Sequence, residues 1–194
     1  LNDDSIAGGK GFGTHPHENM EIITIPLEGA LAHKDNMGNG TIIRKGDIQV
    51  MSAGTGITHS EFNSNEDHAV KVLQIWLFPN KKNVTPRYDQ LSLQNIEVKN
   101  EFYQILSPNQ NDQGVWIYQN SWFSLAEFDY DKEVNYNLNL TSNGVYIFVI
   151  EGEIKVGKES LGKRDGFGIW NTEKINISAL KGAKILLMEL PMSV

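Results

Sequence analysis

Short runs rich in β-branched and aromatic residues recur along the whole chain, and glycine, asparagine and aspartate separate them. Such runs are typical of β-strands bounded by turns. They cover residues 21–27, 41–44, 71–78, 146–150 and 185–190. The segment 35–40, Asp-Asn-Met-Gly-Asn-Gly, predicts a hairpin loop because Asn and Gly tolerate positive φ. Because no segment has a long amphipathic helical period, we expect an all-β fold.

The two halves of the chain share a weak internal repeat. A strand leading to Glu28-Gly29 in the first half resembles one leading to Glu151-Gly152 in the second half. Further along, residues 44–51 resemble residues 163–170. Two jelly-roll-like β-barrels in tandem, a bicupin, account for such a repeat, whereas chance similarity among glycine-rich β sequences is the alternative.

The bicupin hypothesis divides the chain into two domains. We expect residues 1–80 to form the first domain, which binds metal and lacks its first segment because the chain begins at Leu1. Residues 81–98 are expected to connect the domains, with a short helix near residues 88–91, and residues 99–194 to form a second cupin-like domain without metal ligands. Trp116, Tyr118 and Trp122 are expected to pack into this second barrel.

Composition excludes several classes of protein. The longest apolar stretches are far shorter than the roughly 20 residues of a membrane-spanning helix, so we expect no membrane association. A formal net charge of -7 argues against direct nucleic-acid binding. No secretory leader is visible, so a cytoplasmic location is expected. We also expect a monomer. With no cysteine, a metal site must consist of imidazole and carboxylate.

Two short motifs supply these ligand types. His15-Pro16-His17 and His59-Ser60-Glu61 each carry their ligands two residues apart, which directs both side chains to one face of a strand. Two facing strands then bring three nitrogens and one oxygen to one point. This set suits iron, nickel, manganese, copper or zinc, and octahedral coordination leaves two positions open for substrate or dioxygen.

The case for other histidine and glutamate residues as metal ligands is weaker. Glu21 competes with Glu61 for the carboxylate role, because it occupies the usual ligand position of the general cupin motif. His33 and His68 lie beside a hairpin loop and in a polar stretch, and we interpret them as solvated imidazoles without a special role.

Several linked motifs together resemble the signature of the pirin family. The resemblance covers most of the first domain and the connection, and the second domain matches only by its barrel pattern. The motifs are Gly13-Thr14-His15-Pro16-His17, Leu27-Glu28-Gly29, His33-Lys34-Asp35, Gly46-Asp47-Ile48-Gln49, the stretch from Met51 to Glu61, Gln74-Ile75-Trp76 and Thr85-Pro86-Arg87-Tyr88.

The resemblance implies a metal site and an activity. One divalent metal, Fe(II) by preference, is expected on His15, His17, His59 and Glu61, so Glu61 is preferred over Glu21. Bacterial members imply a quercetin 2,3-dioxygenase, which opens a flavonol with dioxygen and releases carbon monoxide. Glu61 then remains a ligand or accepts the proton of the flavonol hydroxyl. The alternatives are a non-enzymatic, redox-responsive iron protein, as animal pirins suggest, or another cupin enzyme such as an isomerase.

These alternatives predict different surroundings for the metal. A deep apolar pocket favours the dioxygenase, a polar pocket the isomerase, and an occluded metal the regulatory protein. Phe12, Met20, Met51 and Ile57 are candidates for the pocket wall, although apolar strand residues more often belong to the core.

Overall fold

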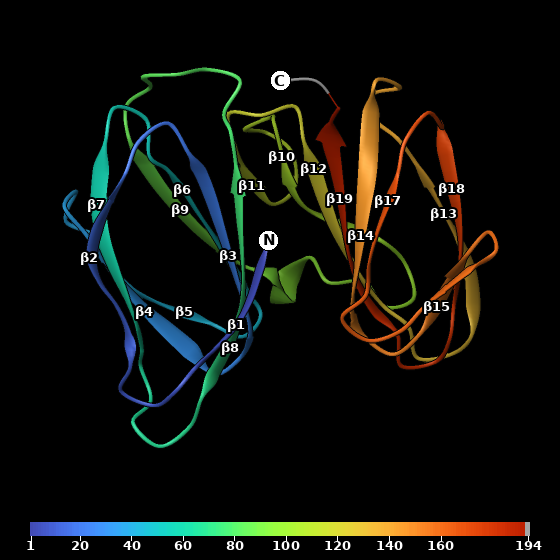
Figure 1. The fold of residues 1–194 in the computed structure, drawn as a ribbon, viewed down its shortest axis with the longest axis horizontal. Coiled ribbons are helices and arrows are strands. Elements are labelled where there is room, and N and C mark those ends of the chain that lie inside the picture. Colours follow the sequence, from blue (N-terminus) through green and yellow to red (C-terminus); the bar gives the residue numbers. More distant parts are fainter. Residues whose placement is uncertain (193–194) are drawn as a thin grey trace. The chain divides into compact units, whose positions relative to one another are not determined.

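The structure is a computed structural model that describes residues 1–192. These residues form strands and one short 3-10 helix, η1 (Leu93–Asn95). They divide into two compact units, the first comprising residues 1–95 and 115–119 and the second residues 96–114 and 120–192 (Figure 1). Within the described part of the chain, no helix is long and apolar enough to cross a membrane.

Two antiparallel sheets make up the first unit. One has the strand order β1-β8-β3-β6-β9 and the other the order β2-β7-β4-β5, so the chain passes repeatedly from one sheet to the other. The strands are β1 (Asn2–Ile6), β2 (Gly11–His17), β3 (Glu21–Glu28), β4 (Ala30–Asp35), β5 (Gly40–Arg44), β6 (Asp47–Ser52), β7 (Ile57–Asn63), β8 (Val70–Leu77) and β9 (Arg87–Ser92), and the short β11 (Val115–Trp116) also belongs to this unit.

The interior of the first unit is layered along its strands. On β3, Ile22 is followed two residues later by Thr24, and on β8, Val72 is followed by Gln74, so each pair faces the same side. Ile22 and Val72 belong to two separate apolar clusters. Thr24 lies opposite Gln74 in the β3–β8 register. A polar layer therefore separates two apolar layers.

The second unit repeats the two-sheet plan. Strands β10, β12, β19, β14 and β17 form one sheet in that order, and β13, β18, β15 and β16 form the other. The strands are β10 (Tyr103–Ser107), β12 (Trp122–Glu127), β13 (Lys132–Asn137), β14 (Asn143–Glu151), β15 (Ile154–Val156), β16 (Glu159–Leu161), β17 (Gly166–Ile169), β18 (Lys174–Ala179) and β19 (Lys184–Pro191). The core includes Phe128, Ile147, Ile177 and Leu187.

The structure confirms the Glu-Gly part of the internal repeat. In both units a bulge interrupts the strand pairing just before the glutamate, Glu28 at the end of β3 and Glu151 at the end of β14. Gly29 and Gly152 then adopt φ values of 74° and 76°, a left-handed conformation that favours glycine. The same turn therefore ends corresponding strands in the two units.

In the second part of the repeat, the sequence alignment of residues 44–51 with residues 163–170 was wrong by one residue. The Asp47 Oδ2 atom accepts a 2.9 Å hydrogen bond from the Arg44 amide, and Asp165 Oδ2 accepts a 2.8 Å bond from the Gly162 amide. The residue before each aspartate has positive φ, 89° and 70°. Asp47 therefore corresponds to Asp165, whereas the sequence alignment had paired it with Gly166.

Two local expectations were wrong. Residues 88–91 lie in strand β9, because pairing with β6 outweighs any helical tendency, and only η1 follows as a single helical turn. Trp116 and Tyr118 belong to the first unit. The Arg87 guanidinium lies 3.8 Å from the Trp116 ring centroid and donates a 2.6 Å hydrogen bond to the Trp116 carbonyl.

Candidate functional site

Strands β2 and β7 bring three histidines together. His15 lies directly opposite His59 in the antiparallel register, after a bulge that begins at Phe12. His17 lies two residues further along β2, on the same face as His15. The ring centroids are 4.9 Å apart for His15 and His17, 4.4 Å for His15 and His59, and 5.0 Å for His17 and His59. One nitrogen from each ring lies within 4.8 Å of the others.

The loop before β7 depends on a glycine. Gly54 has a φ of 49°, and a Cβ atom there would lie 2.0 Å from the Val84 carbonyl oxygen. The next residue, Thr55, donates a 3.0 Å backbone hydrogen bond to that same oxygen. Close packing of two backbone segments thus fixes the start of the strand that carries His59.

Hydrogen bonds define which ring nitrogens are free. The Nδ1 atom of His15 is 2.8 Å from the Gly13 carbonyl oxygen, which only accepts, so this Nδ1 carries the proton and Nε2 has the lone pair. The Nδ1 atom of His59 is 3.5 Å from Nδ1 of His33, while its Nε2 is buried without a hydrogen-bond partner. A bound metal ion is a physical reason for burying such a nitrogen.

Burial and mutual repulsion favour the neutral form of His59 and His17. Burial lowers the pKa of His59 to about 3, and the nearby rings of His15, His33 and His17 contribute further. The pKa of His17 is also lowered, by burial first and then by His15. Neutral imidazoles offer lone pairs to a divalent transition metal, so the donor set fits such an ion.

Glu61 lies next to the three-histidine cluster. Its carboxylate accepts hydrogen bonds of 3.1 and 2.9 Å from Gln74 Nε2, and Trp76 Nε1 donates a 3.1 Å bond to Gln74 Oε1. Burial raises the pKa of Glu61 against the opposing effect of Gln74. A Glu61 oxygen lies within 4.8 Å of nitrogens of His59 and His33, so the carboxylate adjoins the cluster from the side of His33.

Glu21, the competing carboxylate, has different neighbours. The Ser52 hydroxyl donates a 2.7 Å hydrogen bond to it, and both residues are buried. Burial raises the pKa of Glu21 to about 7, while Ser52, the Tyr118 backbone and the charge of Arg87 oppose the shift. Among the described residues, Glu21 belongs to neither cluster of potential metal ligands.

The interpretation of His33 as a solvated imidazole was wrong. Its side chain is buried, because β4 directs it inward opposite Glu61, and its Nε2 lies 3.1 Å from the Asp35 carboxylate. The signal in the sequence was His33-Lys34-Asp35, a third pair of polar residues two positions apart on a strand. His68 is exposed, as expected.

A cavity of about 670 Å³ opens beside the candidate ligands. Two aromatic residues, Phe12 and Trp76, contribute to its wall, and His15 and Glu61 reach it. The complete lining is Asn2, Asp4, Gly11, Phe12, Gly13, His15, Glu61, Gln74 and Trp76. Of the four apolar candidates, only Phe12 is in this lining, whereas Met51 and Ile57 are core residues with Met20 packed against them.

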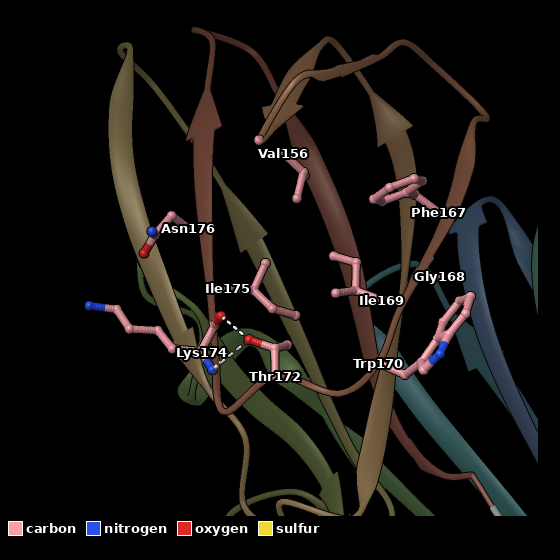
Figure 2. A pocket seen from close by; sticks show the side chains of 10 residues that line it. Val156, Phe167, Gly168, Ile169, Trp170, Thr172, Lys174, Ile175 and Asn176 are labelled. Atoms are coloured by element: carbon pink, nitrogen blue, oxygen red, sulfur yellow. Dashed lines mark hydrogen bonds between the residues drawn. The ribbon is translucent and has the colours of Figure 1, made fainter.

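The second unit has a cavity of another kind. It measures about 480 Å³, and the side chains of Val156, Phe167, Ile169 and Ile175 point into it (Figure 2). Its lining contains no histidine or carboxylate. Within the described residues, both clusters of potential metal ligands lie in the first unit.

Two family profiles match separate parts of the chain. The Pirin family profile matches residues 1–77, and that of the quercetinase C-terminal cupin domain matches residues 104–190. The quercetin 2,3-dioxygenase of Escherichia coli strain K12 is 36% identical over 195 residues, which cover 98% of this chain and 81% of that protein. A pirin-like protein of Caulobacter vibrioides is 34% identical, with 97% and 81% covered.

Solved structures give the same result. The crystal structure of YhhW from Escherichia coli matches with a TM-score of 0.91 and 35% identity, covering 97% of this chain and 79% of that chain. The nickel(II) complex of bacterial pirin YhhW matches with a TM-score of 0.90 and 34% identity, covering 97% and 80%. Fold and relatives together define an all-β bicupin of the oxidoreductase type. The chain belongs to the pirin family, as the sequence motifs predicted.

Proposed function

We propose that the chain is a metal-dependent dioxygenase that cleaves a flavonol such as quercetin. One divalent metal ion, Fe(II), would bind to His15, His17, His59 and Glu61. The observation that carries the proposal is the buried Nε2 atom of His59, which lacks a hydrogen-bond partner within a cluster of three imidazoles beside an open cavity. The nickel(II) complex of a relative supports a metal ion of this class.

The bound metal ion would act as a Lewis acid that acidifies a coordinated substrate hydroxyl. Glu61 would either remain a ligand or detach to accept the proton of that hydroxyl, and its carboxylate reaches the cavity while Gln74 bonds to both of its oxygens. Trp76, which donates to Gln74, keeps that amide oriented with its NH₂ group toward Glu61. A chain of two hydrogen bonds therefore holds the Glu61 carboxylate in place.

The cavity has both aromatic and polar walls, so it is neither the purely apolar pocket nor the purely polar pocket of the two expectations, and its aromatic part supports an aromatic substrate. Phe12 and Trp76 offer flat apolar surfaces to a ring system, and Asn2 and Asp4 offer polar groups to its hydroxyls. Because His15 and Glu61 both reach the cavity, the proposed metal position is open to substrate. This openness favours the enzyme over a regulatory protein with an occluded metal.

The test is oxygen consumption with quercetin by the full chain loaded in turn with iron, nickel, manganese or copper. Wild-type protein is expected to turn over with at least one metal, and His59→Ala is expected to lose that activity. His68→Ala is the matched control, because it removes an exposed histidine outside the cluster. Bound metal without turnover in the wild type would reject the dioxygenase and favour the regulatory alternative.

A further inference from the structure

A line of three buried side chains leads from the hairpin loop to the candidate metal site. Nε2 of His33 lies 3.1 Å from Oδ2 of Asp35, and Nδ1 of His33 lies 3.5 Å from Nδ1 of His59. All three residues are buried. The cross-strand register brings them together, since Asp35 lies opposite His59 on neighbouring strands.

Asp35 is itself held firmly by the hairpin loop. Its Oδ1 atom accepts hydrogen bonds of 2.9 Å from the Met37 amide and 3.0 Å from the Asn39 amide. Its Oδ2 atom accepts a 2.8 Å bond from Asn39 Nδ2, in addition to the contact with His33. A carboxylate with this many donors acts only as an acceptor. The Nε2 atom of His33 must therefore carry a proton.

This first proton determines the others. With its proton on Nε2, a neutral His33 has its lone pair on Nδ1, so His59 must donate from Nδ1. His59 then has its lone pair on Nε2, the atom without a partner in the protein. The opposite arrangement would place a buried N–H there with nothing to receive it, which is costly.

The contacts also argue against His33 as a metal ligand in its own right. His33, His59 and Glu61 do form a second cluster with donor atoms within 4.8 Å. However, both nitrogens of His33 already have partners in the protein. The atom that lacks a partner is the Nε2 of His59, on the side of the other cluster.

We propose that His33, anchored by Asp35, is a positioning residue that fixes His59 in the tautomer whose Nε2 atom binds the metal. The inference deepens the proposed function and rests on it for the assignment of His59 as a metal-binding residue. Outer-shell partners of this kind typically contribute ten- to a hundredfold to metal affinity.

Asp35→Asn tests the proton arrangement with little change of shape. The Asn carbonyl oxygen must still accept the Met37 and Asn39 backbone amides, so its NH₂ group faces His33 and donates to Nε2. The Asn39 side chain, whose Nδ2 atom donates to Asp35 in the wild type, must then turn to present its oxygen to this NH₂ group. His33 then donates from Nδ1, and His59 is forced into the tautomer with a proton on Nε2. We expect nickel(II) affinity to fall about ten- to a hundredfold.

Two substitutions of His33 separate its hydrogen bond from its bulk. His33→Leu removes the acceptor, whereas His33→Asn places an amide oxygen near the position of Nδ1. We expect a loss of affinity similar to that of Asp35→Asn in the first variant and recovery in the second. Tyr88→Phe is the matched control, because the Tyr88 ring lies 4.9 Å from the His33 ring and its hydroxyl bonds to Gln90 and Thr41 and not to His33.

The decisive readout is the histidine tautomer in metal-free protein, from long-range proton–nitrogen spectra of nitrogen-15-labelled samples. We expect a proton on Nδ1 of His59 in the wild type and in His33→Asn, and on Nε2 in Asp35→Asn. A wild-type His59 with its proton on Nε2 would overturn the inference, as would wild-type affinity in both Asp35→Asn and His33→Leu.

This design separates two kinds of failure. If wild-type protein binds no nickel(II), the proposed function fails, and the metal-free spectra still decide whether His33 and Asp35 set the tautomer. A variant that merely loosened the fold would lower its melting temperature without shifting the His59 proton from one nitrogen to the other, and His33→Asn would not restore affinity.

Discussion

Buried ionisable side chains in the first unit divide into two groups with different partners. The histidine cluster lies beside the open cavity, whereas Glu21 lies in a separate network with Ser52. Arg87 Nη1 donates a 3.4 Å hydrogen bond to the Ser52 hydroxyl, so a positive charge is nearby. Glu21 remains costly to ionise despite this charge, because burial has the larger effect on its pKa.

Glu21 should therefore make stability depend on pH. Its pKa rises from about 4.5 in the unfolded chain to about 7 in the fold. The unfolded state thus loses its proton first, and this residue's contribution to stability falls as the pH rises from 4.5 to 7. Between pH 5 and pH 8, the free energy of unfolding of Glu21→Gln is expected to rise by about 2 kcal/mol relative to that of wild type. Urea unfolding at both pH values measures the gain.

The exposed Glu66→Gln serves as the control for this prediction. This variant shows how the loss of an exposed carboxylate affects the free energy of unfolding at the two pH values. A Glu21→Gln difference from wild type that is the same at both pH values would show that Glu21 ionises normally in the fold.

At the residue scale, the sequence predicted which side chains share a strand face but not what each one meets across the sheet. The two-residue spacing correctly indicated that His15 and His17 face the same way. His33 was misjudged because its burial depends on β4 lying between β5 and β7, which no local pattern reveals. The Gln74 bonds to Glu61 join residues 13 positions apart on strands of different sheets, and were equally invisible.

At the level of strands, buried polar anchors hold connections in place. In the second unit, Glu189 on β19 is fully buried and accepts five hydrogen bonds of 2.9 Å. The donors are the Tyr136 hydroxyl, the backbone and side-chain amides of Asn139, the Leu140 amide and the Asn143 side chain. One carboxylate thus ties the connection between β13 and β14 to β19.

Glu189→Gln is expected to lower the free energy of unfolding by about 2 to 3 kcal/mol, because its NH₂ group must face donors that now lack an acceptor. Glu133→Gln, on the exposed face of β13, is the matched control and should stay within about 0.5 kcal/mol of wild type. Chemical denaturation of the full chain provides both values. Equal effects of the two substitutions would refute the anchoring role.

Strand patterns were predictable where alternation or β-branched residues were dense, as in β3, β8 and β19. They failed where long-range pairing decides the structure. Residues 87–92 gave no clear strand signal, and β9 forms because β6 offers a free edge for pairing. The one-residue error in the repeat has a similar cause, since Arg164 takes the positive φ that Gly46 takes in the first unit.

At the scale of the whole molecule, two similar units differ in their chemistry. The first has a polar interior layer with the histidine cluster, and the second has an apolar core with a cavity free of histidine and carboxylate. All five histidines of the chain lie within the first 68 residues. We therefore expect one metal ion per chain, bound by the first unit.

Calorimetric titration of metal-free protein with nickel(II) tests this expectation most directly. Wild type and His68→Ala should each bind one equivalent per chain, and His59→Ala should show no saturable binding over the same concentration range. Undiminished binding by His59→Ala, or a stoichiometry of two in the wild type, would contradict a single metal site on His15, His17, His59 and Glu61.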